Sequence, residues 1–152
     1  MIGTLPSADL LKTWNDREKK LFDTNPTRTP PLCTLPDGMA GTTTALMGVM
    51  TGADAKIAGA EAARTVPGRE HGGNCDIKNL SRGSKVFFPV YVDGAGLSMG
   101  DIHWSQGDGE ITFCGAIEMA GWIDISVDII KGGMEMYGVT NPIFQTSPID
   151  AN

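Results

Sequence analysis

The segment from Trp122 to Ile130 alternates cleanly between apolar and polar residues. Successive side chains of a β-strand point to opposite sides, so this alternation separates one apolar face from one polar face. A half-buried strand of an antiparallel sheet has this pattern. The apolar face would carry Ile123, Ile125, Val127 and Ile129, and the polar face Asp124, Ser126 and Asp128. The segment therefore predicts a strand in an antiparallel sheet.

Further strands are expected before this segment. Ser84–Val92 is rich in Val, Phe and Tyr, and its Pro89 predicts an edge or interrupted strand rather than a central one. Leu97–Gln106 and Glu110–Met119 flank Gly107-Asp108-Gly109, a sequence typical of the turn in a hairpin. We therefore expect residues 67–152 to be mainly antiparallel β.

Residues 1–66 have a different character. Apolar residues recur at helical spacing from Ala8 to Phe22, with Ser7 as a plausible N-cap. The stretch from Pro26 to Pro36 is too rich in proline for a helix or a central strand and predicts a long irregular connection. Gly52–Arg64 predicts a short, weakly amphipathic helix. We expect one mainly β domain with one or two helices.

Charge and cysteine content exclude several classes of protein. The formal net charge is -6, and the 12 basic residues are scattered, which argues against a nucleic-acid partner. Neither a basic amphipathic face nor a long apolar run predicts membrane association. The first residues do not resemble a signal peptide, and three widely spaced cysteines are typical of free thiols. We expect a cytoplasmic protein.

The two histidines are the natural candidates for chemistry, because imidazole is the commonest metal ligand and a ready general base. Period two places Asp101 and His103 on one face of the predicted hairpin. The same argument places Glu110, Thr112, Cys114 and Glu118 on a common face across the turn. An ordinary half-solvated sheet also alternates in this way, so the pattern leaves both interpretations open.

Several unusual residues precede this hairpin. Gly72 and Gly73 allow a sharp turn or a close approach to a ligand, and would leave His71, Asn74 and Asp76 facing a shared space. Two histidines and several carboxylates suffice for an open catalytic zinc site with three protein ligands and a water. Their spacing matches neither H-E-x-x-H nor an EF-hand loop and does not identify a metal by itself.

Four stretches resemble the acetamidase/formamidase family, closest to its formamidase branch. They are RTVPGREHGGNCDIKNLSRGS at 64–84, GDIHWSQGDGE at 100–110 continuing into TFCGAIE at 112–118, WNDRE at 14–18 and NPIF at 141–144. The resemblance covers nearly the whole chain. Family enzymes are substantially longer, so the chain is expected to be a single partial domain, the central portion of the family sequence.

The resemblance implies hydrolysis of short aliphatic amides, such as formamide to formate and ammonia, on an antiparallel sandwich or barrel-like scaffold that forms oligomers. It also implies a divalent metal, for which zinc is the expected ion. Carried over by motif, the metal ligands are His71, Asp101 and His103, the catalytic residues are Glu110, Asp108 and Glu118, and the substrate-binding residues are Asn74, Asp76, Trp104 and Gln106.

Two alternatives stay open. The chain could be a non-catalytic fragment or subunit that needs a separate complementary chain. In a third interpretation Cys75 or Cys114 is a covalent nucleophile, with Cys75 the better candidate because it lies beside His71 and Asp76 in the sequence.

Overall fold

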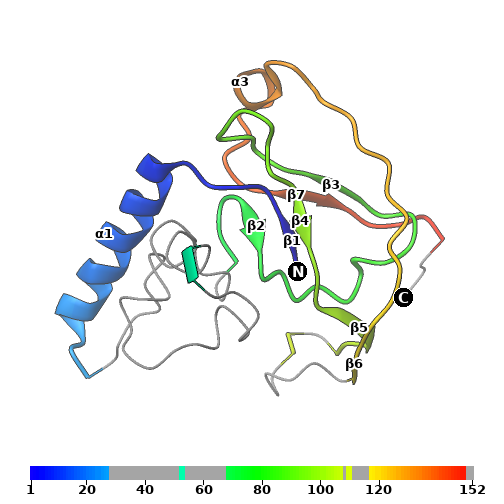
Figure 1. Ribbon diagram of the computed structural model, residues 1–152, viewed down its shortest axis with the longest axis horizontal. Coiled ribbons are helices and arrows are strands. Elements are labelled where there is room, and N and C mark those ends of the chain that lie inside the picture. The colour runs from blue at the N-terminus through cyan, green and yellow to red at the C-terminus, as the bar shows by residue number, and fades with distance from the viewer. Residues whose placement is uncertain (28–51, 54–67, 108, 111–116, 150–152) are drawn as a thin grey trace. The chain divides into compact units, whose positions relative to one another are not determined.

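The fold is taken from a computed structural model that describes residues 1–27, 52–53, 68–107, 109–110 and 117–149 (Figure 1). Its contacts divide the chain into two compact units. One unit consists of residues 1–5 and 68–152, and the other of residues 6–67. Each unit is described by itself.

The unit of residues 6–67 contains helix α1, Ala8–Thr24. Ser7 has an extended backbone, and its hydroxyl accepts a hydrogen bond from the amide of Leu10 at 3.2 Å, which satisfies one otherwise unpaired donor of the first turn. Trp14 is buried, with 1% of its surface exposed. The predicted helix and its cap are confirmed.

The other predictions for this unit fall largely outside the described residues. Pro26 lies in a turn, but the remainder of the proline-rich connection is outside the description. Residues 52–53 of the predicted Gly52–Arg64 helix are helical, and the rest of that segment is likewise outside.

The second unit is built around strand β1, Ile2–Gly3, which lies between β2, Gly72–Gly73, and β4, Ser98–Met99. Both pairings are antiparallel, and Ile2 is opposite Gly73 on one side and Met99 on the other. A Cβ built on Gly3 would lie 2.6 Å from the amide nitrogen of Gly73. The glycines were predicted to allow a sharp turn or a close approach to a ligand, and the close approach that the structure shows is instead between β2 and the backbone of β1.

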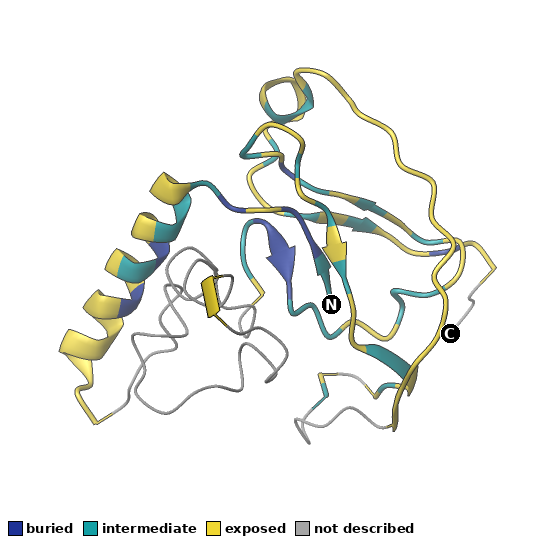
Figure 2. Ribbon diagram, in the orientation of Figure 1, coloured by how far each residue is buried: buried dark blue, intermediate teal, exposed yellow. Residues whose placement is uncertain are grey.

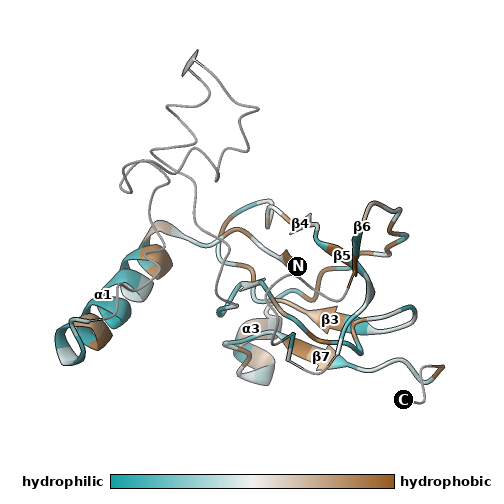
Figure 3. Ribbon diagram, turned by 90° about the horizontal axis from the view of Figure 1, so that it is seen from below, coloured by the Kyte–Doolittle hydropathy of each residue, from teal (hydrophilic) through white to brown (hydrophobic). Residues whose placement is uncertain are grey.

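A separate two-stranded sheet joins β3, Lys85–Phe87, to β7, Ile143–Gln145, in antiparallel register. Both strands are predominantly hydrophobic (Figure 3). A short helix, α3, Gly133–Tyr137, precedes β7. Strand β3 ends before Pro89, which is buried and has no amide hydrogen to donate to a ladder. The prediction of an interrupted edge strand is confirmed.

The third sheet is the hairpin of β5, Ile102–Ser105, and β6, Ile117–Met119. The predicted single strand Leu97–Gln106 is wrong in one respect, since it breaks into β4 and β5. Asp101 causes the break: its φ of 58° lies in the left-handed region, outside strand geometry.

The predicted hairpin pairing is confirmed, but its register is not the one that a turn on Gly107-Asp108-Gly109 would give. A turn closing on residues 107–109 would have paired His103 with Phe113, whereas His103 lies opposite Glu118. The register also shifts between His103 and Ser105, as in a β-bulge.

The prediction of a strand at Trp122–Ile130 is also wrong. Among the described residues this segment belongs to no strand, and all of its residues are exposed, as the yellow colour after β6 shows (Figure 2). The exposed fraction reaches 99% for Trp122 and 74% for Ile129. Alternation predicts which faces a strand would have, but a strand forms only when a neighbour satisfies its backbone hydrogen bonds.

The predicted fold class is nevertheless confirmed, because the described sheets are antiparallel and helices accompany them. No helix within the described part of the chain is long and apolar enough to cross a membrane.

Candidate functional site

The hairpin β5–β6 brings together three groups that can bind a metal. His103 on β5 is directly opposite Glu118 on β6, and Asp101 lies immediately before β5. One ligand atom from each of these three residues lies within 4.8 Å of the others. The carboxylates of Asp101 and Glu118 belong to exposed residues, whereas the His103 side chain is only 7% exposed. A largely buried imidazole thus faces two accessible carboxylates.

Hydrogen bonds orient the ring of His103. Its Nδ1 is 2.8 Å from Oε1 of Gln106, and its Nε2 is 3.3 Å from Oδ1 of Asp101. As placed, the Gln106 oxygen can only accept, so Nδ1 carries the proton and donates it. Nε2 is the nitrogen that faces the carboxylate of Asp101.

The surroundings of His103 shift its proton equilibrium. Burial lowers the pKa of His103, but the hydrogen bonds to Gln106 and Asp101 and the nearby carboxylate charges outweigh it, so the pKa is raised above its usual value. These surroundings therefore favour a positive charge on the His103 ring.

The three residues fit a divalent metal. Imidazole nitrogen and carboxylate oxygen are ordinary zinc ligands, and three protein ligands with one open position define a catalytic zinc site. Two ligand atoms on a tetrahedral zinc ion lie about 3.3 Å apart, which agrees with the 3.3 Å between His103 Nε2 and Asp101 Oδ1. The Gln106 carbonyl on Nδ1 matches the outer hydrogen bond that orients a metal-binding histidine.

A second pair of carboxyl groups lies near these residues. Strand β1 joins the Gly72–Gly73 strand to β4, and so brings Asp76 toward Asp101. Burial raises the pKa of Asp76 above its usual value, and a hydrogen bond with Glu110 and the charges of Glu110 and Asp101 add to the effect. Asp76 thus keeps its proton to higher pH than an ordinary aspartate does and can donate it in a hydrogen bond to Glu110.

His71, the other predicted ligand, is not in the group of Asp101, His103 and Glu118. It is buried, with 5% of its surface exposed, and its carbonyl oxygen accepts a hydrogen bond from the amide of Thr4 at 2.9 Å. Burial, with the charge of Arg69, lowers the pKa of His71 below its usual value and favours the neutral ring. Its role as a ligand stays a prediction.

The remaining predicted residues are placed as follows. Asn74 is half-buried beside β2, Trp104 on the hairpin is 74% exposed, and Asp108 lies outside the described residues. Gln106 was predicted to bind substrate, and the structure shows it holding His103. The sequence pattern did not indicate this contact. Residues 103 and 106 would point to opposite faces of a continuous strand, but β5 ends at Ser105, so the Gln106 side chain can turn back to His103.

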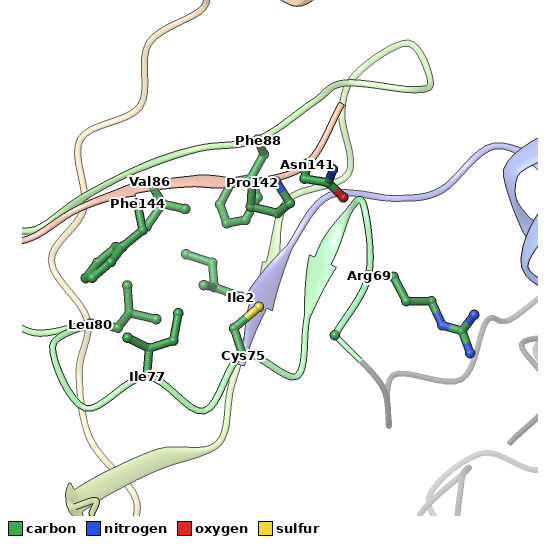
Figure 4. A pocket seen from close by; sticks show the side chains of 11 residues that line it. Ile2, Arg69, Cys75, Ile77, Leu80, Val86, Phe88, Asn141, Pro142 and Phe144 are labelled. Carbon is green, nitrogen blue, oxygen red and sulfur yellow. The ribbon is translucent and has the colours of Figure 1, made fainter. Parts of the chain in front are cut away.

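Cys75 borders an apolar pocket rather than the candidate metal site. The pocket has a volume of about 390 Å³, and Cys75, Ile2 and Phe144 are among the residues that line it (Figure 4). Asp101, His103 and Glu118 do not line it. Burial raises the pKa of the Cys75 thiol above its usual value, so the thiolate that a nucleophile needs is disfavoured. Cys114 lies outside the described residues.

Comparison with known proteins agrees with the resemblance that the sequence motifs carry, which is to a family of amide hydrolases. The Acetamidase/Formamidase family model matches residues 1–152. The chain belongs to the acetamidase/formamidase family. It is 62% identical over 149 residues to the formamidase of Methylophilus methylotrophus and 57% identical over 151 residues to the acetamidase of Mycolicibacterium smegmatis.

A solved structure shows the same fold. The gamma lactamase from Delftia acidovorans superposes with a TM-score of 0.78 at 64% identity, covering 97% of this chain and 35% of that one. The two curated relatives are matched over 98% and 99% of this chain and over 36% of their own length. The chain thus spans about a third of the proteins it resembles.

Proposed function

We propose that this chain carries the metal-binding hairpin of an amide hydrolase that converts short aliphatic amides, such as formamide, to a carboxylate and ammonia. The observation that supports this proposal most is the convergence of Asp101, His103 and Glu118 within 4.8 Å. The names of the relatives support the reaction class, since one is called a formamidase and another an acetamidase.

In this proposal Asp101, His103 and Glu118 hold a divalent ion, for which zinc suits the mixture of imidazole and carboxylate donors. When bound, such an ion supplies a Lewis acid that polarises the amide carbonyl and acidifies water. Gln106 keeps the His103 ring in place through Nδ1, so that Nε2 stays directed at the site. Glu118, first predicted to be catalytic, thereby becomes a proposed ligand.

Glu110 is the proposed general base. Water adds to the carbonyl carbon while the Glu110 carboxylate takes a proton from it; that proton then passes to the nitrogen as the carbon–nitrogen bond breaks, which yields the acid and ammonia. The hydrogen bond between Asp76 and Glu110, which together with burial raises the pKa of Asp76, is proposed to orient the Glu110 carboxylate. Asn74 and Trp104 are proposed to contact substrate, Asp108 to assist proton transfer, and His71 to support the site as a further ligand.

The test separates metal binding from turnover. His103→Ala and Glu118→Gln should each lower bound zinc, measured by elemental analysis after dialysis, and abolish ammonia release from formamide. Asp124→Asn is the matched control, because it removes an exposed carboxylate outside the cluster and should change neither quantity. Undiminished zinc in both variants would show that the metal is held elsewhere.

A second proposal follows from the length of the relatives, of which the chain spans about a third. The chain would then be a non-catalytic fragment or subunit that becomes active only with a complementary chain, or as part of an oligomer. Two results together would support it. The isolated chain should bind stoichiometric zinc without releasing ammonia from formamide, and ammonia release should appear after the rest of the family sequence is supplied. If Cys75 were the nucleophile, Cys75→Ala would abolish turnover. The cytoplasmic location stays a prediction.

A further inference from the structure

The segment Trp122–Ile130 has the sequence of a strand without the environment of one. No described residue forms a ladder hydrogen bond with its backbone. The amide of Ile129 bonds to the carboxylate of Asp128 at 2.8 Å, and the carbonyl of Ile130 accepts a turn hydrogen bond from the amide of Gly133 at 3.0 Å. Its apolar face is open to solvent, with exposed fractions of 46% for Ile123, 49% for Ile125 and 68% for Val127. Unpaired backbone beside exposed apolar side chains is a ready template for another strand.

The segment is also continuous with the candidate site. It follows β6, the strand that carries Glu118, and runs as an extended stretch to α3 (Figure 1). Ile117 and Met119 of β6 are themselves 58% and 40% exposed, so the open apolar surface begins on the hairpin. A strand that covers Trp122–Ile130 would therefore also approach β6.

We propose that Trp122–Ile130 is an acceptor strand that pairs with a β-strand from the part of the family fold outside this chain. The relatives have nearly two thirds of their length outside the matched region, which is ample chain to provide such a strand. Pairing would satisfy the free backbone groups and bury the apolar face of Ile123, Ile125 and Val127.

A second copy of the chain suits this surface poorly. In symmetrical antiparallel pairing about Ser126, Asp124 of one copy would lie directly opposite Asp128 of the other, and like charges directly opposite each other are destabilising. Each copy also carries a net charge of -6. These charges favour a strand of different sequence.

Hydrogen exchange tests the pairing without reference to catalysis. The isolated chain is compared with a chimera in which it replaces the matched region of the Methylophilus methylotrophus formamidase, and with the chain co-expressed with the remaining parts of that formamidase. We expect the amides of residues 123–129 to exchange at least about 100-fold more slowly in either assembly than in the isolated chain. Equally fast exchange in both assemblies, with the paired amides of β3 and β7 protected as evidence that the same unit is folded, would overturn the proposal.

Matched variants identify the buried face. In the protected assembly Ile125→Asp should raise the exchange rate of the amides of residues 123–129 at least about tenfold. Ser126→Asp adds the same charge to the polar face and should change that rate by less than about twofold. Equal effects would contradict the proposed burial. Protection in the isolated chain that rises with concentration, together with a dimer by native mass spectrometry, would overturn the proposal in favour of a second copy. An assembly that is protected but inactive would refute the proposed function alone.

Discussion

Gly72 is expected to be the most sensitive glycine in the sheet that positions Asp76 and His71. Its φ of +96° is one that L side chains rarely adopt, and a Cβ there would lie 2.6 Å from the carbonyl oxygen of Ile2 and 2.7 Å from Cε1 of Phe88. Backbone strain of this kind costs about 1–3 kcal/mol, and forcing an extra carbon into packed structure costs about 1–3 kcal/mol. Gly72→Ala should therefore destabilise the fold by about 2–6 kcal/mol.

Other glycines of the same unit separate the two contributions. Gly94 has a φ of +80° with no atom within 4 Å of a built Cβ, so Gly94→Ala tests strain alone. Gly3 has no positive φ but would meet Gly73 at 2.6 Å, so Gly3→Ala tests the clash alone. Gly100→Ala adds a carbon to open space at an ordinary φ and should be close to neutral.

Urea unfolding of the four variants measures the free energies of unfolding. The loss for Gly72→Ala should exceed that for Gly94→Ala by about 1–3 kcal/mol, the cost of the clash. If Gly72→Ala were no more destabilising than Gly94→Ala, the close contact between β1 and β2 would not exist as described. The positioning of Asp76 beside Asp101 would then lose its structural basis.

Three further predictions concern single side chains. Ser7→Ala should lower the stability of the helical unit by about 1 kcal/mol through loss of the N-cap, as judged by circular dichroism during thermal unfolding, and a loss near zero would show that the Leu10 amide has another acceptor. The pKa of His71 is lowered in the folded state, so its contribution to stability is fully present above its ordinary value of 6.5 and is lost as the pH falls below that value. His71→Gln should therefore flatten the decline in stability between about pH 7 and pH 5 in urea titrations, and an unchanged slope would contradict a buried neutral ring. Gln106→Leu should weaken zinc binding about 10–100-fold in competition with a chelator, and unchanged affinity would show that Nδ1 of His103 needs no acceptor.

Much of the local structure could be predicted from the sequence. The helical spacing after Ser7 and the capping hydroxyl both depend on neighbours within a few residues, and α1 begins where they indicate. Pro89 ends β3 because proline has no amide hydrogen, which is also a local property. Period two predicted that Asp101 and His103 share a face, but Asp101 lies before β5 with a φ of 58°, so its place beside His103 and Glu118 is not a consequence of strand alternation.

The register of that pairing was beyond local reasoning. Gly107-Asp108-Gly109 is a favourable turn sequence, yet the hairpin aligns His103 with Glu118, a partner five residues beyond the one that this turn would have selected. The positive φ of Asp101 likewise divides one predicted strand between two sheets. Register depends on what each face packs against, so distant parts of the chain decide it.

The sequence by itself determined the family, the antiparallel β character and the helix that begins at Ala8, and it singled out Asp101 and His103 as candidate metal ligands, because motifs and periodicity are local properties of the chain. Only the tertiary structure decided that Glu118 rather than His71 groups with Asp101 and His103, and that Gln106 holds the imidazole. It also decided that Trp122–Ile130, for all its alternation, pairs with no strand among the described residues, since backbone hydrogen bonds between strands join residues far apart in sequence.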